Sequence, residues 1–427
     1  MLHRAKQKNP AALVVAVGCY VQTGREDVEQ DPCIDLAIGN NRKKDLASIL
    51  EEYLRDLEQE DAVAENAENA GHGVDKTLHD TTVIDINHTA EYEEMTLKQT
   101  AEHTRAYIKI QDGCNQFCSY CVIPYARGRV RSRRAEDIIR EITGMAQNGY
   151  REIVLTGIHI SSYGIDFDEE AWKRGESVSV LKEDEERRDY SGSSKLIDLL
   201  ERIHTIEGIE RIRIGSLEPR IITEETAARM AALPKLCPHF HLSLQSGCDA
   251  TLRRMNRKYT SEEYAESVAL LRKVFDHPAI TTDVIVGFPG ETEQEFAQTK
   301  EFLDRIQFFE MHIFKYSKRA GTRAAVMSHQ VPDPVKTTRS AELLAMEKEQ
   351  SKQFRTHYVG REAEVLLEET KEIGGTEYLL GHTRDYVKLA VSVKENKKNV
   401  ANTVICGRVQ GFLTDEILLL SPLEFSK

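Results

Sequence analysis

The central part of the chain, residues 99–348, alternates short apolar runs with longer stretches in which apolar residues recur at helical spacing. Runs of β-branched and other apolar residues predict six strands, at 106–110, 153–156, 209–214, 240–244, 281–286 and 312–316. Amphipathic patterns between them predict helices at 135–147, 195–204, 223–232, 261–275 and 292–306. Strands that alternate with helices pair in parallel, so we expect an α/β fold, a partial (βα)6 barrel, with a surface insertion at 167–190.

The first 98 residues carry a weaker pattern. Apolar runs at 13–17 and 35–39 predict two strands, and an amphipathic helix follows them. Two strands and one complete helix cannot bury a sheet that is covered on both faces, so we expect residues 1–57 to be a remnant of an α/β domain. Residues 58–98 are rich in Glu, Asn, Ala and Thr, which predicts an acidic linker.

The last part of the chain changes to a two-residue alternation of apolar and polar positions with glycine turns. This pattern predicts strands at 362–367, 378–380, 387–393, 404–409 and 417–420. Five short strands in residues 350–423 predict a small OB-like β-barrel, a size class that includes oligonucleotide-binding barrels.

Composition and charge exclude several classes of protein. A chain of 427 residues that is 40% apolar is long enough for two or three globular domains. Its longest apolar run, residues 11–17, is far shorter than the ~18 residues of a membrane-spanning helix. Eight cysteines are too few for a disulfide-rich secreted scaffold, so we expect a cytoplasmic protein. The net charge of −13 argues against nonspecific coating of nucleic acid but leaves room for a local basic site.

Three of the eight cysteines form one tight group. Cys114, Cys118 and Cys121 have the spacing C-x3-C-x2-C and follow the first predicted strand of the central part. Three thiolates are one fewer than the four ligands of a closed zinc or iron–sulfur site. The favoured interpretation is an iron–sulfur cube with one iron open to a substrate. The alternatives are a zinc site completed by a distant histidine, or three unrelated buried thiols.

This motif resembles the radical S-adenosylmethionine (SAM) superfamily. The longer segments KIQDGCNQFCSYCVIPYARGRVRSR, EIVLTGIHISSYG, GSLEPR, FHLSLQSGCDATLRRMNRKYT, TTDVIVGFPGETEQEF and FKYSKRAGTRA resemble its methylthiotransferases over essentially the whole chain. The match is best to the branch acting on N6-threonylcarbamoyladenosine at position 37 of tRNA. The resemblance implies that residues 99–348 are a radical SAM core, that 350–423 are a TRAM RNA-binding barrel, and that the activity is a transferase giving the 2-methylthio derivative.

The resemblance also implies cofactors and partners. A [4Fe-4S] cluster on Cys114, Cys118 and Cys121 would bind SAM through its open iron, and reduction would release a 5′-deoxyadenosyl radical. The substrate would be tRNA, the electron donor a flavodoxin or ferredoxin, and the protein a monomer without a membrane partner. Sister activities on isopentenyladenosine or on an aspartate of a ribosomal protein remain alternatives.

Several residues at the ends of the predicted strands are candidates for SAM contact. Gly157 lets a ligand approach the backbone or simply ends a strand. Glu218, with Ser216 in the same layer, accepts a hydrogen bond from a ribose hydroxyl of SAM, or it forms a cap or an ion pair with a nearby residue. Gln245 would orient a ligand by hydrogen bonds without adding charge. The Tyr120 side chain contacts the adenine of SAM or packs in the core.

Candidate tRNA contacts come from two segments. Arg127, Arg129 and Arg131 belong to a run of five arginines at 127–134, directly after the cysteine group, where phosphates would be positioned. The alternative is a solvated charged run. Arg361 and Lys388 are cations near strand ends of the predicted barrel, where they fit RNA binding.

Cys19 has a separate implied role. In the family, its Gly-Cys-Tyr element supplies one ligand of a second [4Fe-4S] cluster, whose other two cysteines come earlier, and this chain has no cysteine before Cys19. We therefore expect an incomplete N-terminal domain, which makes an inactive RNA-binding homologue the alternative of another class. Cys33 is interpreted as a small core residue.

Overall fold

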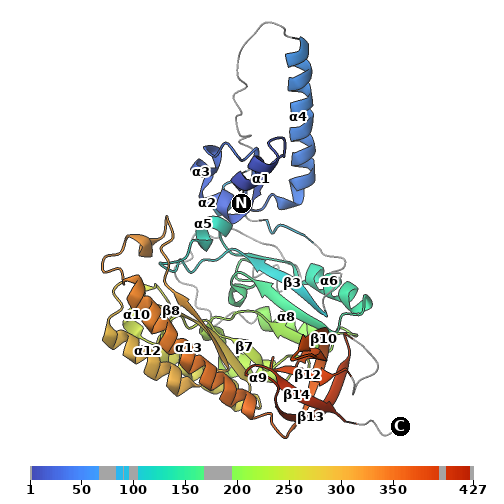
Figure 1. Cartoon of the computed structure of the whole chain (residues 1–427), viewed down its shortest axis with the longest axis vertical. Coiled ribbons are helices and arrows are strands. Elements are labelled where there is room, and N and C mark those ends of the chain that lie inside the picture. Colours follow the sequence, from blue (N-terminus) through green and yellow to red (C-terminus); the bar gives the residue numbers. More distant parts are fainter. Residues whose placement is uncertain are drawn as a thin grey trace.

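The computed structural model describes residues 2–66, 83–89, 91–95, 104–167, 195–393 and 401–423, which form three units (Figure 1). An N-terminal unit lies at one end, a curved sheet with helices forms the middle, and a small barrel packs at the other end. The predicted insertion and part of the predicted linker fall outside the described residues. Phe167, the first residue of that insertion, is buried and packs against Tyr163, so it belongs to the core.

The middle unit contains the six predicted parallel strands. The first three, β3 (Arg105–Asp112), β5 (Glu152–Gly157) and β6 (Arg211–Ile214), pair in this order. The other three, β7 (His239–His241), β8 (Ala279–Val286) and β9 (Glu310–Lys315), pair likewise. Two isolated bridges, Ile212 to Leu236 and Leu217 to Leu242, join the halves. A short strand β4 (Arg131–Ser132) runs antiparallel to β3. The partial barrel is confirmed.

Helices cover the convex face of this sheet. They are α6 (Ala135–Gln147), α8 (Lys195–His204), α9 (Glu224–Ala231), α11 (Ser261–Val274), α12 (Glu293–Ile306) and α13 (Asp333–Thr356). Thr260 and Thr292 begin α11 and α12 with reciprocal capping boxes, which satisfy otherwise free amides. Alternate strand residues such as Ile108 and Met311 are buried against the helices, whereas Tyr107 and His312 are exposed and face the concave side.

The N-terminal unit is a two-stranded parallel sheet with helices. It contains α1 (Leu2–Lys8), β1 (Val15–Val17), α2 (Cys19–Thr23), α3 (Arg25–Glu29), β2 (Leu36–Ile38) and α4 (Leu46–Asn66), and α4 projects away from the other units (Figure 1). The helix runs past the expected start of the linker at residue 58. Part of the linker is also well packed, because Ile86 is buried and the Tyr92 hydroxyl donates to the Lys109 carbonyl at 3.0 Å.

The C-terminal unit is a closed five-stranded barrel in the order β10-β11-β12-β14-β13. Its strands are β10 (Glu362–Ile373), β11 (Thr376–His382), β12 (Lys388–Ser392), β13 (Val404–Phe412) and β14 (Leu418–Pro422). Each overlaps a predicted strand. Inward residues such as Val365, Leu379 and Leu389 are fully buried and form the barrel core.

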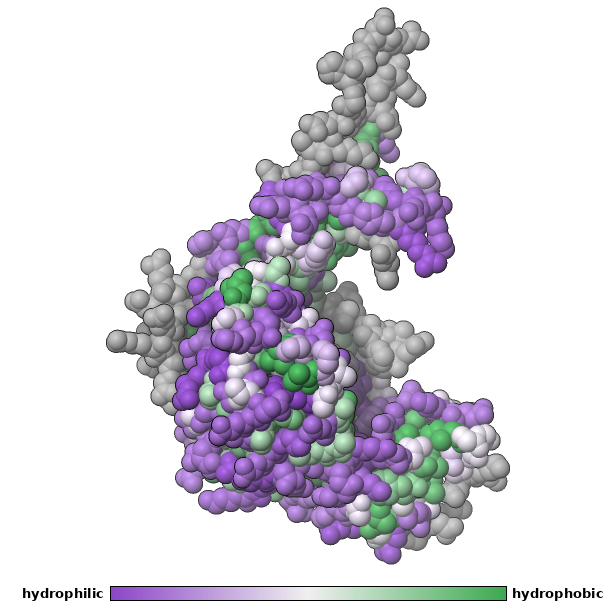
Figure 2. Space-filling model, turned by 60° about the vertical axis from the view of Figure 1, so that its left-hand side comes forward, coloured by the Kyte–Doolittle hydropathy of each residue, from purple (hydrophilic) through white to green (hydrophobic). Residues whose placement is uncertain are grey.

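A membrane-spanning helix needs both length and hydrophobicity. None of the described helices is both long and apolar enough to cross a bilayer. The face shown in Figure 2 is mostly hydrophilic, and its hydrophobic residues gather in small groups.

The C-terminal barrel is joined to the sheet by a buried charge network. Glu152, at the start of β5, is fully buried and lies 3.0 Å from Arg105 Nε, 2.7 Å from Arg213 Nε and 3.7 Å from an Arg211 terminal nitrogen. Arg213 also donates to the carbonyls of Thr383 and Arg384, at 2.7 and 2.8 Å. One carboxylate on β5 therefore lies among three guanidinium groups from two neighbouring strands, β3 and β6, and those groups bind the barrel.

Replacing Glu152 with Gln should destabilise the protein strongly. Removing one partner of a buried ion pair leaves uncompensated charge and costs about 3–5 kcal/mol. The matched control is Glu262→Gln, because Glu262 pairs with Arg305 at an exposed site and such pairs contribute about 0–1 kcal/mol. Urea unfolding followed by circular dichroism measures both variants. Equal losses in the two variants would contradict this account of the interface.

Candidate active site

The cysteine loop begins at Gly113, directly after β3. Gly113 has a φ of +72°, and a Cβ at this position would lie 1.8 Å from the Arg129 carbonyl oxygen, so only glycine fits. The amide of Cys114 donates to the Gly128 carbonyl at 3.0 Å. The loop therefore folds back on the segment after α5 (Ile123–Arg127), at the carboxyl edge of the sheet.

The structure brings the three predicted ligands together. Cys114 and Cys118 are buried and Cys121 is half-buried. Burial raises the pKa of the Cys114 thiol to about 12, and the neighbouring Cys118 and Cys121 raise that pKa further. Cys118 and Cys121 line a pocket of about 190 Å³, together with Phe117, Ser119, Tyr125, Thr322 and Arg323.

Residues far along the chain hold the loop in place. The Ser119 hydroxyl donates to the Arg254 carbonyl at 2.8 Å, at the end of α10 (Asp249–Arg254). Asn256 Nδ2 donates to the Phe117 carbonyl at 2.9 Å. An Arg257 terminal nitrogen lies 3.3 Å from Cys118 Sγ, so a positive charge lies directly beside the cysteine group.

The thiol arrangement fits a cluster better than a single zinc ion. A zinc ion with Zn–S bonds of about 2.3 Å would hold its thiolates roughly 3.8 Å apart. Among the described residues, the groups whose ligand atoms all lie within 4.8 Å of one another do not include Cys114, Cys118 and Cys121. Thiols that do not all lie within 4.8 Å of one another suit the larger cube, and the pocket that Cys118 and Cys121 line provides space for a ligand.

Glu218 is the best placed of the predicted SAM contacts. It is buried, and its Oε1 accepts from Arg220 Nε at 2.9 Å. Its Oε2 is also buried and has no hydrogen-bond partner among the described residues. A buried carboxylate oxygen without a partner is costly, so Glu218 fits a site that a ligand hydroxyl completes.

The other predicted SAM contacts have mixed surroundings. Gly157 and Ser216 are exposed at the same edge, and a Cβ on Gly157 would lie 2.7 Å from Ile160. Gln245 is buried with a φ of +72° and continues the parallel pairing beyond β7 through a bridge to Val284. Tyr120 is half-buried and packs edge-on against Phe288, so the packing alternative holds for at least one side of its ring.

Two site residues escaped prediction from the sequence. Arg257, which contacts Cys118, lies 139 positions away from it along the chain. His159 follows β5, and its amide donates to Gln111 Oε1 at 2.8 Å. Burial lowers the pKa of His159 to about 3, with Arg257 and Arg220 adding to the effect, so its imidazole is neutral at pH 7. In the sequence, the one feature that could have marked them is that Arg257 follows the fourth predicted strand and His159 the second, inside the segments that resemble the family.

The arginines of the run at 127–134 have different surroundings in the structure. Arg131 is almost fully buried and donates to the carbonyls of Arg127 and Arg129, at 2.9 and 3.2 Å. The prediction that Arg131 binds tRNA is therefore wrong for this structure, because its guanidinium holds the loop backbone. Arg129 is half-buried and lies over the Phe117 ring at 4.7 Å, beside the pocket.

Arg127 links the cysteine loop to the N-terminal unit. Its Nε lies 3.1 Å from Cys19 Sγ, and Asn40 Nδ2 donates to the Ala126 carbonyl at 2.6 Å. Cys19 is half-buried at the carboxyl edge of the small sheet, facing the segment that follows the three thiols. The structure thus places the thiol of the implied second cluster next to the first site.

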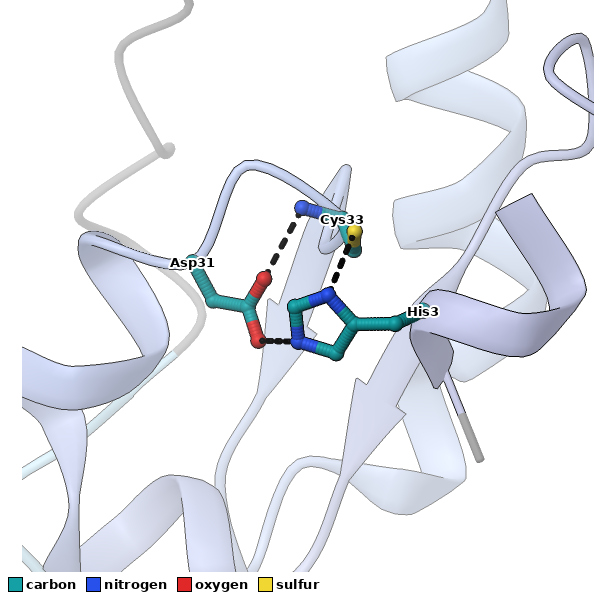
Figure 3. Close-up of side chains that lie close together, drawn as sticks. All are labelled: His3, Asp31 and Cys33. Atoms are coloured by element: carbon teal, nitrogen blue, oxygen red, sulfur yellow. Dashed lines mark hydrogen bonds and ion pairs between the residues drawn. The ribbon is translucent and has the colours of Figure 1, made fainter. Parts of the chain in front are cut away.

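Cys33 has a different environment from the one expected. Its Sγ lies 3.1 Å from Nδ1 of His3, and Nε2 of the same ring lies 3.1 Å from Asp31 Oδ2 (Figure 3). Cys33 is half-buried, so its interpretation as a core residue is wrong. It precedes β2 whereas Cys19 follows β1, so the two thiols lie at opposite edges of a parallel pair and do not share a ligand site.

The two candidate cations of the C-terminal barrel differ in exposure. Arg361 is exposed, whereas Lys388 is half-buried and lies 3.5 Å from Glu369 Oε1. Tyr386 stacks on His239 and His382 in the interface with the sheet, with ring centroids 4.9 and 4.5 Å apart. Arg361 is therefore the most accessible of these candidates.

Comparisons with known proteins agree with this geometry. Residues 108–303 match the family model described as the radical SAM superfamily. The chain is 34% identical over 397 residues to the threonylcarbamoyladenosine tRNA methylthiotransferase MtaB of Bacillus subtilis (strain 168), covering 93% of this chain and 78% of that protein. It is 36% identical over 366 residues to the tRNA-2-methylthio-N(6)-dimethylallyladenosine synthase of Thermoanaerobacter sp. (strain X514), covering 85% and 68%.

A solved structure of the cobalamin-dependent S-adenosylmethionine radical enzyme OxsB superposes with a TM-score of 0.46 at 12% identity, over 82% of this chain and 50% of that chain. The family assignment rests on the sequence relatives, whose similarity includes the cysteine loop and both flanking units. With a third of its residues identical over most of both chains, the protein belongs to the radical SAM tRNA methylthiotransferase family.

Proposed function

We propose that the protein converts N6-threonylcarbamoyladenosine at position 37 of tRNA to its 2-methylthio derivative. The observation that carries the proposal is the buried loop of three thiols at the carboxyl edge of the sheet, in a chain with a relative named for this activity. A [4Fe-4S] cluster with SAM, when bound there, supplies the radical that attacks an unreactive C–H bond.

The residues of the chain have separate tasks in this proposal. Cys114, Cys118 and Cys121 hold the cluster, and Arg257 offsets their negative charge through its contact with Cys118. Glu218 Oε2 accepts a ribose hydroxyl of SAM. Gly157, Ser216 and Gln245 border the same edge, where backbone and neutral polar groups orient the ligand, and Tyr120 flanks it.

Cys19 is assigned to the second cluster. Its contact with Arg127, which follows the cysteine loop, supports this assignment, because the transfer of sulfur to a base requires the sulfur to lie near the radical site. Cys19 is the first residue of α2, which follows β1 of the small sheet. The cytoplasm is the expected compartment, with a flavodoxin or ferredoxin as electron donor to a monomer.

Replacing any one of Cys114, Cys118 and Cys121 with Ala should abolish SAM cleavage. Two thiolates leave an iron of the cube without its ligand, so the cluster is lost. Anaerobically reconstituted variants are assayed for iron and for 5′-deoxyadenosine. Cys406→Ala is the control, because Cys406 is exposed on the distant barrel. If the unsubstituted protein contained one zinc ion per chain and no iron after reconstitution, the assignment of an iron–sulfur cluster would be wrong.

Removing the gene from its host should eliminate 2-methylthio-N6-threonylcarbamoyladenosine from tRNA. The unmethylthiolated nucleoside should accumulate, because its synthesis precedes this step. Mass spectrometry of digested tRNA measures both nucleosides, and a Cys406→Ala copy should restore the product whereas a Cys114→Ala copy should not. Loss of the dimethylallyl derivative instead would assign the sister activity.

The tRNA surface combines the pocket rim with the C-terminal barrel. Arg129 lies at the pocket and Arg361 is exposed on the barrel, which we assign as a TRAM RNA-binding unit. Truncating the barrel would uncover the arginines that Glu152 neutralises, so single substitutions test this surface more cleanly than deletion.

Substituting Arg129 or Arg361 with Gln should weaken tRNA binding in a salt-dependent way. Each phosphate contact that is lost should lower the slope of log affinity against log salt by roughly 0.7–0.9. Arg305→Gln removes the same charge from the exposed face of α12 and should leave the slope unchanged. Fluorescence anisotropy between about 50 and 200 mM salt provides the slopes. Identical slopes in all variants would exclude both residues from the surface.

A further inference from the structure

The concave face of the sheet carries a polar cluster that the assigned cofactor contacts do not use. His241 on β7, Asp283 on β8 and His312 on β9 alternate with core residues and therefore point to this face. Their ligand-type atoms, one from each residue, all lie within 4.8 Å of one another. Three neighbouring strands thus present two imidazoles and a carboxylate to the same space.

His241 is held in place but has an unused nitrogen. Its Nδ1 lies 3.0 Å from Thr281 Oγ1, which fixes the ring. Its Nε2 is buried, has no hydrogen-bond partner among the described residues, and lies 3.4 Å from Asp283 Oδ2. His312 is exposed and stacks on the His241 ring, with centroids 5.9 Å apart.

The spacing of the cluster suits hydrogen bonds to a ligand. Two groups that each lie about 2.8 Å from a shared oxygen are at most about 5.6 Å apart. The three side chains therefore lie close enough for one small polar group to contact all of them. Imidazoles donate to a carboxylate, and the Asp283 carboxylate accepts from a hydroxyl.

The layer below the cluster is already filled. Tyr386 from the C-terminal barrel stacks on His239, two residues before His241 on β7. The Arg213 guanidinium lies over the same Tyr386 ring at 4.8 Å. The cluster is therefore the first layer above the closed bottom of the concave face.

The cluster lies below the carboxyl edge of the sheet, on the side where the N6 substituent of a bound adenosine would lie. Asp283 lies three residues before Val286, the last residue of β8, so it is roughly 10 Å below the carboxyl edge at about 3.3 Å per residue. C2 of the target adenine has to face the cysteine loop at that edge. C6, which carries N6, and C2 flank ring nitrogen N1, and their outward bonds diverge, so an adenine with C2 at the edge has room to direct its N6 substituent into the concave face.

We propose that His241, Asp283 and His312 bind the N6 substituent of the target adenosine and select a threonylcarbamoyl group over a dimethylallyl group. This inference rests on the proposed function. A threonylcarbamoyl group offers a carboxylate to the imidazoles and a hydroxyl to Asp283. A dimethylallyl group offers only carbon, so it would cover His241 Nε2 and the polar side chains beside it without forming a hydrogen bond to any of them, which disfavours binding.

The test measures binding, so it does not depend on turnover. Three anticodon stem-loop RNAs differ only at position 37, which carries threonylcarbamoyladenosine, dimethylallyladenosine or adenosine. Fluorescence anisotropy with the reconstituted full chain should show binding of the first RNA about 10- to 100-fold tighter than the second, the range expected for one or two hydrogen bonds to charged groups.

The variants His241→Gln, Asp283→Asn and His312→Gln should each reduce that preference while leaving the affinity for the adenosine RNA unchanged. His204→Gln is the matched control, because His204 is the last residue of α8 on the convex side and should keep the preference. Circular dichroism and iron content confirm that each variant is folded and loaded, so a change in preference is not a loss of fold.

Two results would overturn the inference. An unchanged preference in all three variants would place the selection elsewhere, while the host nucleoside analysis would still support the proposed function. A preference that disappears when divalent ions are removed would make the cluster a cation site. Failure of the proposed function itself is distinct, since it appears as an unchanged nucleoside profile after gene removal.

Discussion

The buried carboxylate of Glu152 is the interaction on which the arrangement of the units depends. It faces Arg105, Arg211 and Arg213 at the amino-terminal edge of the sheet. Arg211 and Arg213 in turn donate to carbonyls of the C-terminal barrel, and Arg105 contacts the Tyr386 hydroxyl of the same barrel. Like charges from two neighbouring strands are tolerated in a buried place because this carboxylate lies among them, with Glu368 and Glu364 of the barrel pairing with Arg105 and Arg211. The barrel closes one edge of the sheet, and the opposite edge remains open for the cysteine loop.

Much of the fold could be predicted because its signals are local. Buried parallel strands require continuous apolar runs, and the helices α6 and α8 have the bounds that their amphipathic patterns predict. The cysteine loop was equally predictable, since three thiols within eight residues have few structural alternatives. The helix α4 extends further than expected because charged residues of good helix propensity continue its pattern into the predicted linker.

The parts that could not be predicted depend on contacts between distant segments. Arg129 and Arg131 look equivalent in an alternating run, but a turn buries Arg131 against backbone carbonyls and leaves Arg129 beside Phe117. Tyr386 lies between His239 and His382 only because the barrel packs against the sheet, and no pattern near Tyr386 in the sequence indicates that contact. Arg257 reaches Cys118 only through the fold, so no local pattern marks it.

The opposite placement of the barrel and the cysteine loop has a consequence for the shape of the RNA. The strand β3 runs from Arg105, at the barrel, to Asp112, just before the loop, and its eight residues span about 26 Å at roughly 3.3 Å per residue. If the barrel binds RNA as proposed, an RNA that contacts both the barrel and the cysteine loop has to bridge this length. The length of β3 would then set the distance between the reactive base and the stem that carries it.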